Sequence, residues 1–101
     1  MIPVYLRVWE YQVLPEHVEA FTSTYRADGV WVELFARGQG YLGTELYRSL
    51  DGPERFVTVD RWSDAASWHV FQDRFRTAYR TLDARTHHLT VEERVLLEGE
   101  G

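Results

Sequence analysis

The sequence predicts an α+β domain of the ferredoxin-like, split βαβ type, in which helices cover one face of a four-stranded antiparallel sheet. Runs typical of strands and helices follow one another in the order strand, helix, short helix, strand, strand, helix, strand. This is the order of the split βαβ arrangement. The chain has 101 residues, which is enough to bury one hydrophobic core but not two. We therefore expect one domain that spans residues 1–101.

The first strand is expected from Pro3 to Val13, and both of its faces carry large apolar side chains. Alternation along a strand divides these side chains into two sets. The sets are Val4, Leu6 and Val8 on one face, and Tyr5, Arg7, Trp9 and Tyr11 on the other. A sheet with one face in water would not show this pattern. Helices can cover one face, so we expect a second subunit to cover the other and the protein to be a homodimer.

Two helices are expected between the first and second strands. Pro15 suits the first turn of the first helix, where its missing N–H would have no partner. Gly29 is expected to end that helix in the left-handed conformation. A shorter helix is expected from Val30 to Arg37, followed by Gly38.

The middle of the chain predicts a β-hairpin and then a long helix. The strand-like runs Tyr41–Ser49 and Arg55–Trp62 flank the turn-forming residues Asp51-Gly52-Pro53. Asp64 can cap the helix that follows, because its carboxylate can accept a bond from a free backbone N–H. Apolar residues recur along this segment at helical spacing, so one continuous helix is expected as far as Arg85.

A last strand is expected from Val91 to Glu98, with Val95 and Leu97 on the same face. Glu92 and Glu93 are neighbours in this strand and point to opposite faces. They therefore cannot work as a paired acid and base, and we interpret them as part of a solvated edge.

Composition excludes several classes of partner and chemistry. The formal net charge of −5 argues against a nucleic-acid-binding surface. No apolar run approaches the ~20 residues of a membrane span, and the N-terminus lacks the features of a signal peptide, so a cytoplasmic protein with no membrane partner is expected. The chain has no Cys and no Lys, which excludes thiolate and Schiff-base chemistry and leaves Arg as the permanent side-chain cation.

Two patterns are rejected as cofactor or metal sites. Residues 38–43 match G-x-G-x-x-G, but the dinucleotide fingerprint follows a strand and opens a helix, whereas these glycines end a helix and open a strand. The four histidines have no carboxylates at metal-ligand spacing. We expect no cofactor and no metal.

The segment G-Y-L-G-T-E-L-Y-R, followed by P-E-R-F-V-T-V-D-R-W-S-D-A-A-S-W, places W-x-S between a strand and a helix that carries aromatic residues. In this it resembles the antibiotic biosynthesis monooxygenase (ABM) family. The resemblance implies a homodimeric α/β barrel, in which the sheets of two ferredoxin-like domains pack together. Haem degraders of this family carry a His on the long helix. The corresponding position here lies near Tyr79 or Arg80, neither of which is a His, so haem is not expected.

The resemblance also implies site residues. Cofactor-free oxygenases of the family carry an Asn four residues before the tryptophan of W-x-S, and a Tyr six residues after it. Trp62 matches that tryptophan, whereas Thr58 and Trp68 stand at the other two positions. An Arg of the long helix completes the family's pocket, and Arg80 and Arg85 are the candidates here.

The residues themselves indicate how such a site could work. If Asp60 is buried, its pKa should rise, which would make it a candidate base for a phenolic proton. The hydroxyl of Thr58 and the indole N–H of Trp62 could stabilise the resulting anion. In the alternative interpretation, Asp60 forms an ion pair with Arg7 or Arg61 and the tryptophans belong to the core.

The sequence therefore predicts three catalytic residues: Trp62, Asp60 and Thr58. The residues predicted to bind the substrate are Trp68, Phe71, Tyr79, Arg80 and Phe35. The function expected is binding of a flat aromatic or polycyclic small molecule, with cofactor-free monooxygenation as the reaction. A lyase or isomerase that uses the same pocket, or a dimeric binding module without catalysis, are the alternatives.

Overall fold

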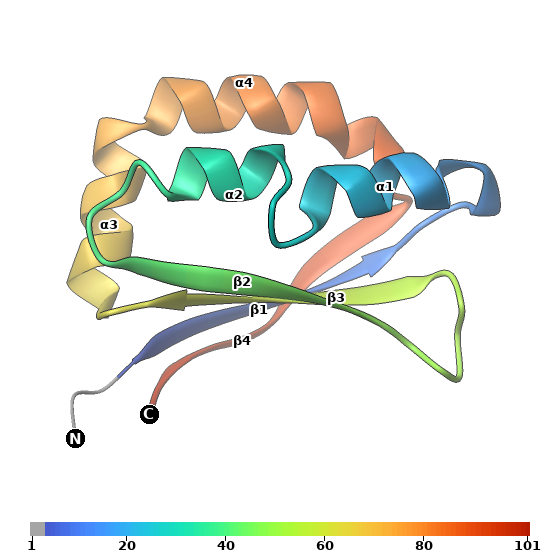
Figure 1. The fold of residues 1–101 in the computed structure, drawn as a ribbon, viewed down its shortest axis with the longest axis horizontal. Helices are drawn as coiled ribbons and strands as arrows, with labels where there is room; N and C mark the ends of the chain where they lie inside the picture. Colours follow the sequence, from blue (N-terminus) through green and yellow to red (C-terminus); the bar gives the residue numbers. More distant parts are fainter. Residues whose placement is uncertain (1–3) are drawn as a thin grey trace.

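A computed structural model describes residues 4–101, and it confirms the predicted α+β ferredoxin-like fold (Figure 1). The elements in chain order are β1 (Tyr5–Gln12), the 3-10 helix η1 (Pro15–His17), α1 (Val18–Tyr25), α2 (Val30–Phe35), β2 (Tyr41–Arg48), β3 (Arg55–Trp62), α3 (Ala65–Arg74), α4 (Arg76–Thr86), the 3-10 helix η2 (His87–Leu89) and β4 (Glu92–Glu100).

The four strands form one antiparallel sheet in the order β2-β3-β1-β4. All the helices lie on one side of it, as Figure 1 shows. In the register of the central strands, Arg7 of β1 pairs with Asp60 of β3, and Trp9 pairs with Thr58. Because paired residues point to the same face, these four side chains all point toward the helices.

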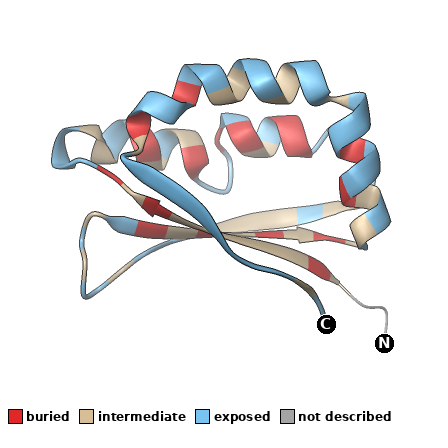
Figure 2. Cartoon of the chain, turned by 180° about the vertical axis from the view of Figure 1, so that it is seen from behind, coloured by how far each residue is buried: buried red, intermediate tan, exposed pale blue. Residues whose placement is uncertain are grey.

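The hydrophobic core lies between this face of the sheet and the helices. Buried positions on the helices and the sheet face one another across this layer (Figure 2). The largest fully buried side chains are Trp62, Phe21, Phe71 and Val13. None of the helices among residues 4–101 has both the length and the apolar character needed to cross a bilayer.

The turn from β3 into α3 confirms the predicted helix start. Asp64 is the N-cap, and its carboxylate accepts a hydrogen bond of 2.7 Å from the backbone N–H of Ser67. This bond satisfies one of the free donors of the first helical turn. The side chain of Ser67, followed by its backbone N–H, lowers the pKa of Asp64. β3 therefore ends at Trp62, directly before the cap, as the sequence predicted.

Gly29 differs from the prediction. Its φ of −81° and ψ of −178° are extended rather than left-handed, and it serves as the N-cap of α2. A Cβ atom at this position would lie 2.4 Å from the carbonyl oxygen of Thr24. Glycine is therefore required because the chain passes close to the end of α1, and not because of a left-handed turn.

The expected single long helix is in fact two helices. The break lies at Phe75, where φ is −113° and ψ is 23°. α3 packs Trp68 and Phe71 against the end of the sheet, and α4 then runs back over the other helices and the sheet (Figure 1). A straight helix could not follow both directions. The apolar spacing continues through the break, which is why the sequence pattern did not reveal it.

The last strand also corrects a prediction. A register shift next to Val8 and Trp9 of β1 leaves Leu96 as an extra residue in β4. Val95 pairs with Trp9 and Leu97 pairs with Val8, so these two residues lie on opposite faces instead of sharing one. A β-bulge of this kind reverses the alternation on either side of it.

Candidate functional site

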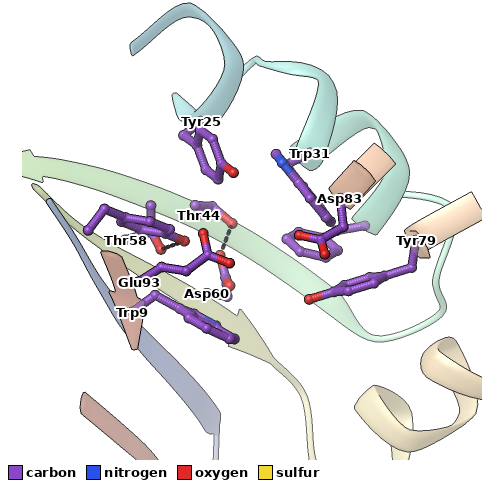
Figure 3. Close-up of a pocket in the computed structure, with 11 residues that line it drawn as sticks. Trp9, Tyr25, Trp31, Thr44, Thr58, Asp60, Tyr79, Asp83 and Glu93 are labelled. Carbon is purple, nitrogen blue, oxygen red and sulfur yellow. Dashed lines mark hydrogen bonds between the residues drawn. The ribbon is translucent and has the colours of Figure 1, made fainter. Parts of the chain in front are cut away.

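An open pocket lies between the sheet and helices α1, α2 and α4 (Figure 3). The space in and around it that protein atoms do not fill is about 440 Å³, which includes open solvent at its mouth. Its walls combine aromatic rings with hydroxyl and carboxyl groups. The residues that line it are Trp9, Tyr11, Tyr25, Trp31, Phe35, Thr44, Thr58, Asp60, Tyr79, Asp83 and Glu93.

Asp60 stands on the floor of this pocket and is almost fully buried, with 5% of its surface exposed. Its Oδ1 accepts a hydrogen bond of 2.7 Å from the hydroxyl of Thr44, on the neighbouring strand β2. Within residues 4–101, no hydrogen-bond donor contacts its Oδ2. Burial raises the pKa of Asp60 to about 6, although the Thr44 hydroxyl and the charge of Arg7 act in the opposite direction.

Arg7 is the cation nearest to Asp60, but it is engaged elsewhere. Its guanidinium lies 4.4 Å from the ring centre of Trp68 and 3.4 Å from the carboxylate of Glu98. It also donates to the hydroxyl of Tyr5 at 3.2 Å. Arg61, the other predicted partner of Asp60, forms its ion pair with Glu45 instead. Asp60 therefore forms no ion pair within the described part of the chain.

Two further carboxylates reach the pocket, Asp83 from α4 and Glu93 from β4. Figure 3 shows that both side chains point into the space above Asp60. Glu93 belongs to an exposed edge strand, but burial of its carboxyl group against the pocket raises its pKa, and the charge of Asp83 raises it further. Glu92 pairs with Gln12 and faces the opposite side. The two glutamates therefore diverge as predicted, and both are exposed on the edge strand, but Glu93 also lines the pocket.

Hydroxyl groups complete the polar lining. Tyr11 and Thr58 share a hydrogen bond of 3.0 Å, and Tyr25 donates to Thr86 at 3.4 Å. The hydroxyl of Tyr79 points into the pocket in Figure 3 and makes no hydrogen bond to the described residues. Burial raises the pKa of Tyr79 to about 12, so this hydroxyl is protonated, and a potential donor, at neutral pH.

The structure brings together four of the residues predicted for the site. Thr58, Asp60, Phe35 and Tyr79 all line the pocket. Arg80 is not among the lining residues, but it is exposed and lines a second hollow that shares Tyr79 and Asp83 with the pocket. Arg85, the alternative to Arg80, is exposed on the same helix.

The predicted aromatic residues Trp62, Trp68 and Phe71 lie in the core rather than on the pocket wall. Their exposed fractions are 0%, 2% and 1%. The ring of Trp62 lies 5.5 Å from that of Trp68 and 5.1 Å from that of Phe71, measured between centroids. The indole N–H of Trp62 has no partner in the described part of the chain. In this arrangement it does not face the pocket.

Sequence reasoning missed more than half of the pocket lining. The strand alternation of β1 carried a signal for Trp9 and Tyr11, because it placed both on the face of Arg7. Thr44 could have been found only from the register between β2 and β3, in which it pairs with Asp60. Asp83 carried no local signal, since the break at Phe75 decides where α4 runs. Glu93 could have been found only from the register between β1 and β4, in which it pairs with Tyr11. The residues that were missed are Trp9, Tyr11, Tyr25, Trp31, Thr44, Asp83 and Glu93.

Across residues 4–101, the His, Asp and Glu side chains form no group of three that could hold a metal ion. The acidic groups of the pocket therefore differ from a metal centre in their arrangement. Chemically, the pocket offers a buried carboxylate with one free oxygen, a tyrosine hydroxyl that can donate, and flat aromatic walls.

The profile of the family described as "Antibiotic biosynthesis monooxygenase" matches residues 4–90 of the chain. The match therefore covers β1 through η2 and includes every pocket residue except Glu93. None of the curated protein sequences compared with the chain matched it significantly.

Solved structures share the fold. A proposed antibiotic biosynthesis monooxygenase from Nitrosomonas europaea superimposes with a TM-score of 0.73 at 18% identity, over 97% of this chain and 89% of that protein. One from Bordetella bronchiseptica has a TM-score of 0.68 at 20% identity, over 97% and 94%. One from Deinococcus radiodurans has a TM-score of 0.72 at 15% identity, over 96% and 91%. At these identities, the similarity establishes the fold.

Proposed function

The chain belongs to the antibiotic biosynthesis monooxygenase family, and we propose that it binds a flat aromatic molecule in the Asp60 pocket and oxidises it with molecular oxygen. The observation that carries this proposal is Asp60 itself. Asp60 is a largely buried carboxylate whose Oδ2 has no donor among the described residues, so a ligand that enters the pocket can donate a hydrogen bond to it. The pocket also has aromatic walls against which a flat ring can pack.

Asp60 is the proposed base. With a pKa of about 6 it is ionised at neutral pH, and it remains basic enough to accept a proton from an acidic phenol or ring C–H group. The hydroxyl of Tyr79, which points into the pocket, is a suitable donor to the anion that forms. Of the pair Tyr11 and Thr58, the hydroxyl that accepts their shared bond keeps its own proton for the same role.

The overall reaction balances without another reductant. An anthrone-type substrate loses two hydrogens from one carbon, and that carbon gains an oxygen atom from O₂ as a carbonyl group. The second oxygen atom leaves as water. Asp60 accepts the first proton, and the substrate anion supplies the electrons that reduce oxygen. We propose that no metal or flavin takes part.

The test measures oxygen consumption with an anthrone substrate. We expect consumption by the native protein, and a loss of roughly 10²-fold or more in Asp60→Asn. Asp64→Asn is the matched control, because it makes the same change at an exposed carboxylate and Asn also caps helices well. Equal rates in the native protein and Asp60→Asn would remove Asp60 from the mechanism. Asp60-dependent exchange of the substrate C–H with deuterium, but without oxygen uptake, would favour the lyase or isomerase alternative.

We also propose that the protein is a homodimer built through the open face of the sheet. Leu6, Val8, Val57 and Val59 lie on this face, away from the helices, and Tyr47 and Leu97 are about half exposed there. The ion pairs Arg61–Glu45 and Arg94–Glu10 lie on the same face. An apolar strip combined with charged pairs in this way favours an interface.

Light scattering can test this dimer with Val59→Asp, which places a charge on the open face. We expect the native protein to be a dimer at micromolar concentration, and the variant to be a monomer. Val70→Asp makes the same change at an exposed position of α3 and should leave the dimer intact. A native protein that is monomeric would contradict the proposal.

A further inference from the structure

The walls of the pocket carry negative charge without positive charge to balance it. Asp60, Asp83 and Glu93 line it, and none of the described residues that line it is Arg or His. The chain also contains no Lys. A neutral or anionic ligand would leave these charges uncompensated in a partly water-excluded space, where charges interact more strongly than in water.

Arg7 does not neutralise the pocket. It is not among the residues that line the pocket, and it contacts Glu98, the hydroxyl of Tyr5 and the ring of Trp68. Its influence on Asp60 is smaller than that of burial, since the pKa of Asp60 is raised and not lowered. The pocket is therefore electrostatically suited to a cation.

The aromatic walls favour a cation for a second reason. Trp9, Trp31, Phe35, Tyr25 and Tyr79 surround the same space as the carboxylates. The face of an aromatic ring carries partial negative charge, and positively charged nitrogens bind next to such faces. Rings combined with carboxylates suit a charged aromatic amine better than a neutral hydrocarbon.

A buried acceptor also points into this space. Only 5% of the surface of Asp60 is exposed, and its Oδ2 has no hydrogen-bond donor within the described residues. A ligand that displaces water from the pocket and brings a donor to the floor can therefore satisfy this oxygen. Asp83 and Glu93 come from different elements and point into the space above Asp60. Burial, and to a smaller extent the charge of Asp83, raises the pKa of Glu93.

We propose that the ligand of this pocket is a flat aromatic molecule with a protonated basic nitrogen, which binds between Asp83 and Glu93 while its acidic O–H or C–H group faces Asp60. This inference rests on the proposed function, and it names the substrate class. The two glutamates of β4 then have different roles: Glu93 contributes to charge selection, whereas Glu92 lies on the other face and does not.

The test compares three tricyclic probes of similar shape by fluorescence titration at about pH 8, where the carboxylates are ionised. The probes are 9-aminoacridine, which is a cation, acridine, which is neutral, and anthracene-9-carboxylate, which is an anion. We expect 9-aminoacridine to bind about tenfold more tightly than acridine, and anthracene-9-carboxylate to bind most weakly. The preference for the cation should shrink as salt is added.

Glu93→Gln and Asp83→Asn should each reduce the preference for the cation about threefold or more, and Glu92→Gln should leave it unchanged. Glu92→Gln removes the same charge one residue away, so it controls for the net charge of the protein. An equal loss in Glu92→Gln and Glu93→Gln would overturn the assignment. Equal binding of acridine and 9-aminoacridine would overturn the inference but leave the proposed pocket standing. Failure of all the probes to bind would contradict both.

Discussion

Two neighbouring positions on one face of β3 have opposite environments. Trp62 is fully buried among rings, whereas Asp60, two residues earlier, lies on the floor of an open polar pocket. Both residues point toward the helices. The difference therefore comes from what the helices place above each of them.

Above Trp62 the space is filled. The rings of Phe35, Tyr41, Trp68 and Phe71 lie 5.1 to 6.0 Å from it, measured between centroids. Above Asp60 an open pocket remains, and Tyr79 and Asp83 of α4 project into it. Phe35 contributes to both regions and marks their border.

This contrast separates stability from function along one strand. A close-packed aromatic region gains free energy from burial and contact between rings. A pocket with a buried carboxylate loses free energy until a ligand satisfies it. Variants in the two regions should therefore behave differently, and four predictions follow in order of the expected change in stability.

Trp62→Ala should cause the largest loss of stability. Removing a fully buried indole leaves a cavity, and we expect the free energy of unfolding to fall by about 3–5 kcal/mol. Urea titration followed by circular dichroism measures this change. Trp62→Phe should cost much less, because it keeps a ring and removes an N–H that has no partner. If Trp62→Ala were as stable as the native protein, the region around it would not be the packed core described above.

Asp60 should make stability depend on pH in a direction opposite to that of a salt-bridged carboxylate. Its pKa is 3.8 when unperturbed and about 6 in the folded protein, so between these values the folded state retains a proton that the unfolded state loses. Below about pH 4, this retained proton contributes its full stabilisation to the folded state. The contribution is lost as the pH rises through 6, which lowers the free energy of unfolding by about 3 kcal/mol in total.

Asp60→Asn should remove this dependence. Urea titrations of both proteins at pH 4 and pH 7 should show the native protein losing up to about 3 kcal/mol more than the variant over this interval. Glu93 is present in both proteins, so its own titration cancels in the comparison. Parallel pH profiles would mean that Asp60 titrates as an ordinary exposed carboxylate.

Gly38→Ala should test whether the Trp62 region has spare room. A Cβ atom at Gly38 would lie 2.8 Å from the ring of Phe71 and 3.0 Å from the ring of Trp62. We expect a loss of about 1–3 kcal/mol in the free energy of unfolding, because both rings are held by their neighbours. Gly52→Ala is the control: its Cβ would meet only ordinary contacts at 3.6 Å, and stability should change little. Equal stability of the two variants would show that the rings can move.

Tyr79→Phe should have the smallest effect on stability. The hydroxyl of Tyr79 makes no hydrogen bond to the described residues, so its loss should change the free energy of unfolding by less than about 0.5 kcal/mol. The rate of anthrone oxidation should nevertheless fall about tenfold or more, since the proposed donor to the anion is removed. A stable variant with an unchanged rate would exclude this role for Tyr79.

Much of the fold was determined by local sequence patterns. The order of strands and helices, the two faces of β1, the hairpin and the cap at Asp64 were all predicted correctly. Each depends on residues within a few positions of one another, such as the alternation of a strand or the reach of a capping side chain. The placement of Asp60 and Thr58 on the helix-facing side of the sheet followed from the same alternation.

Only the tertiary structure decided which part of that face is filled and which is open. The break at Phe75 turns α4 back over the sheet and brings Tyr79 and Asp83 to the pocket, and the bulge at Leu96 sets the face of each residue beyond it in β4. The tertiary contacts also decide that Arg7, one of the predicted partners of Asp60, pairs with Glu98 instead. These features depend on contacts between residues far apart in the chain. Local spacing cannot encode them, because the same pattern of apolar residues fits a straight helix and a broken one equally well.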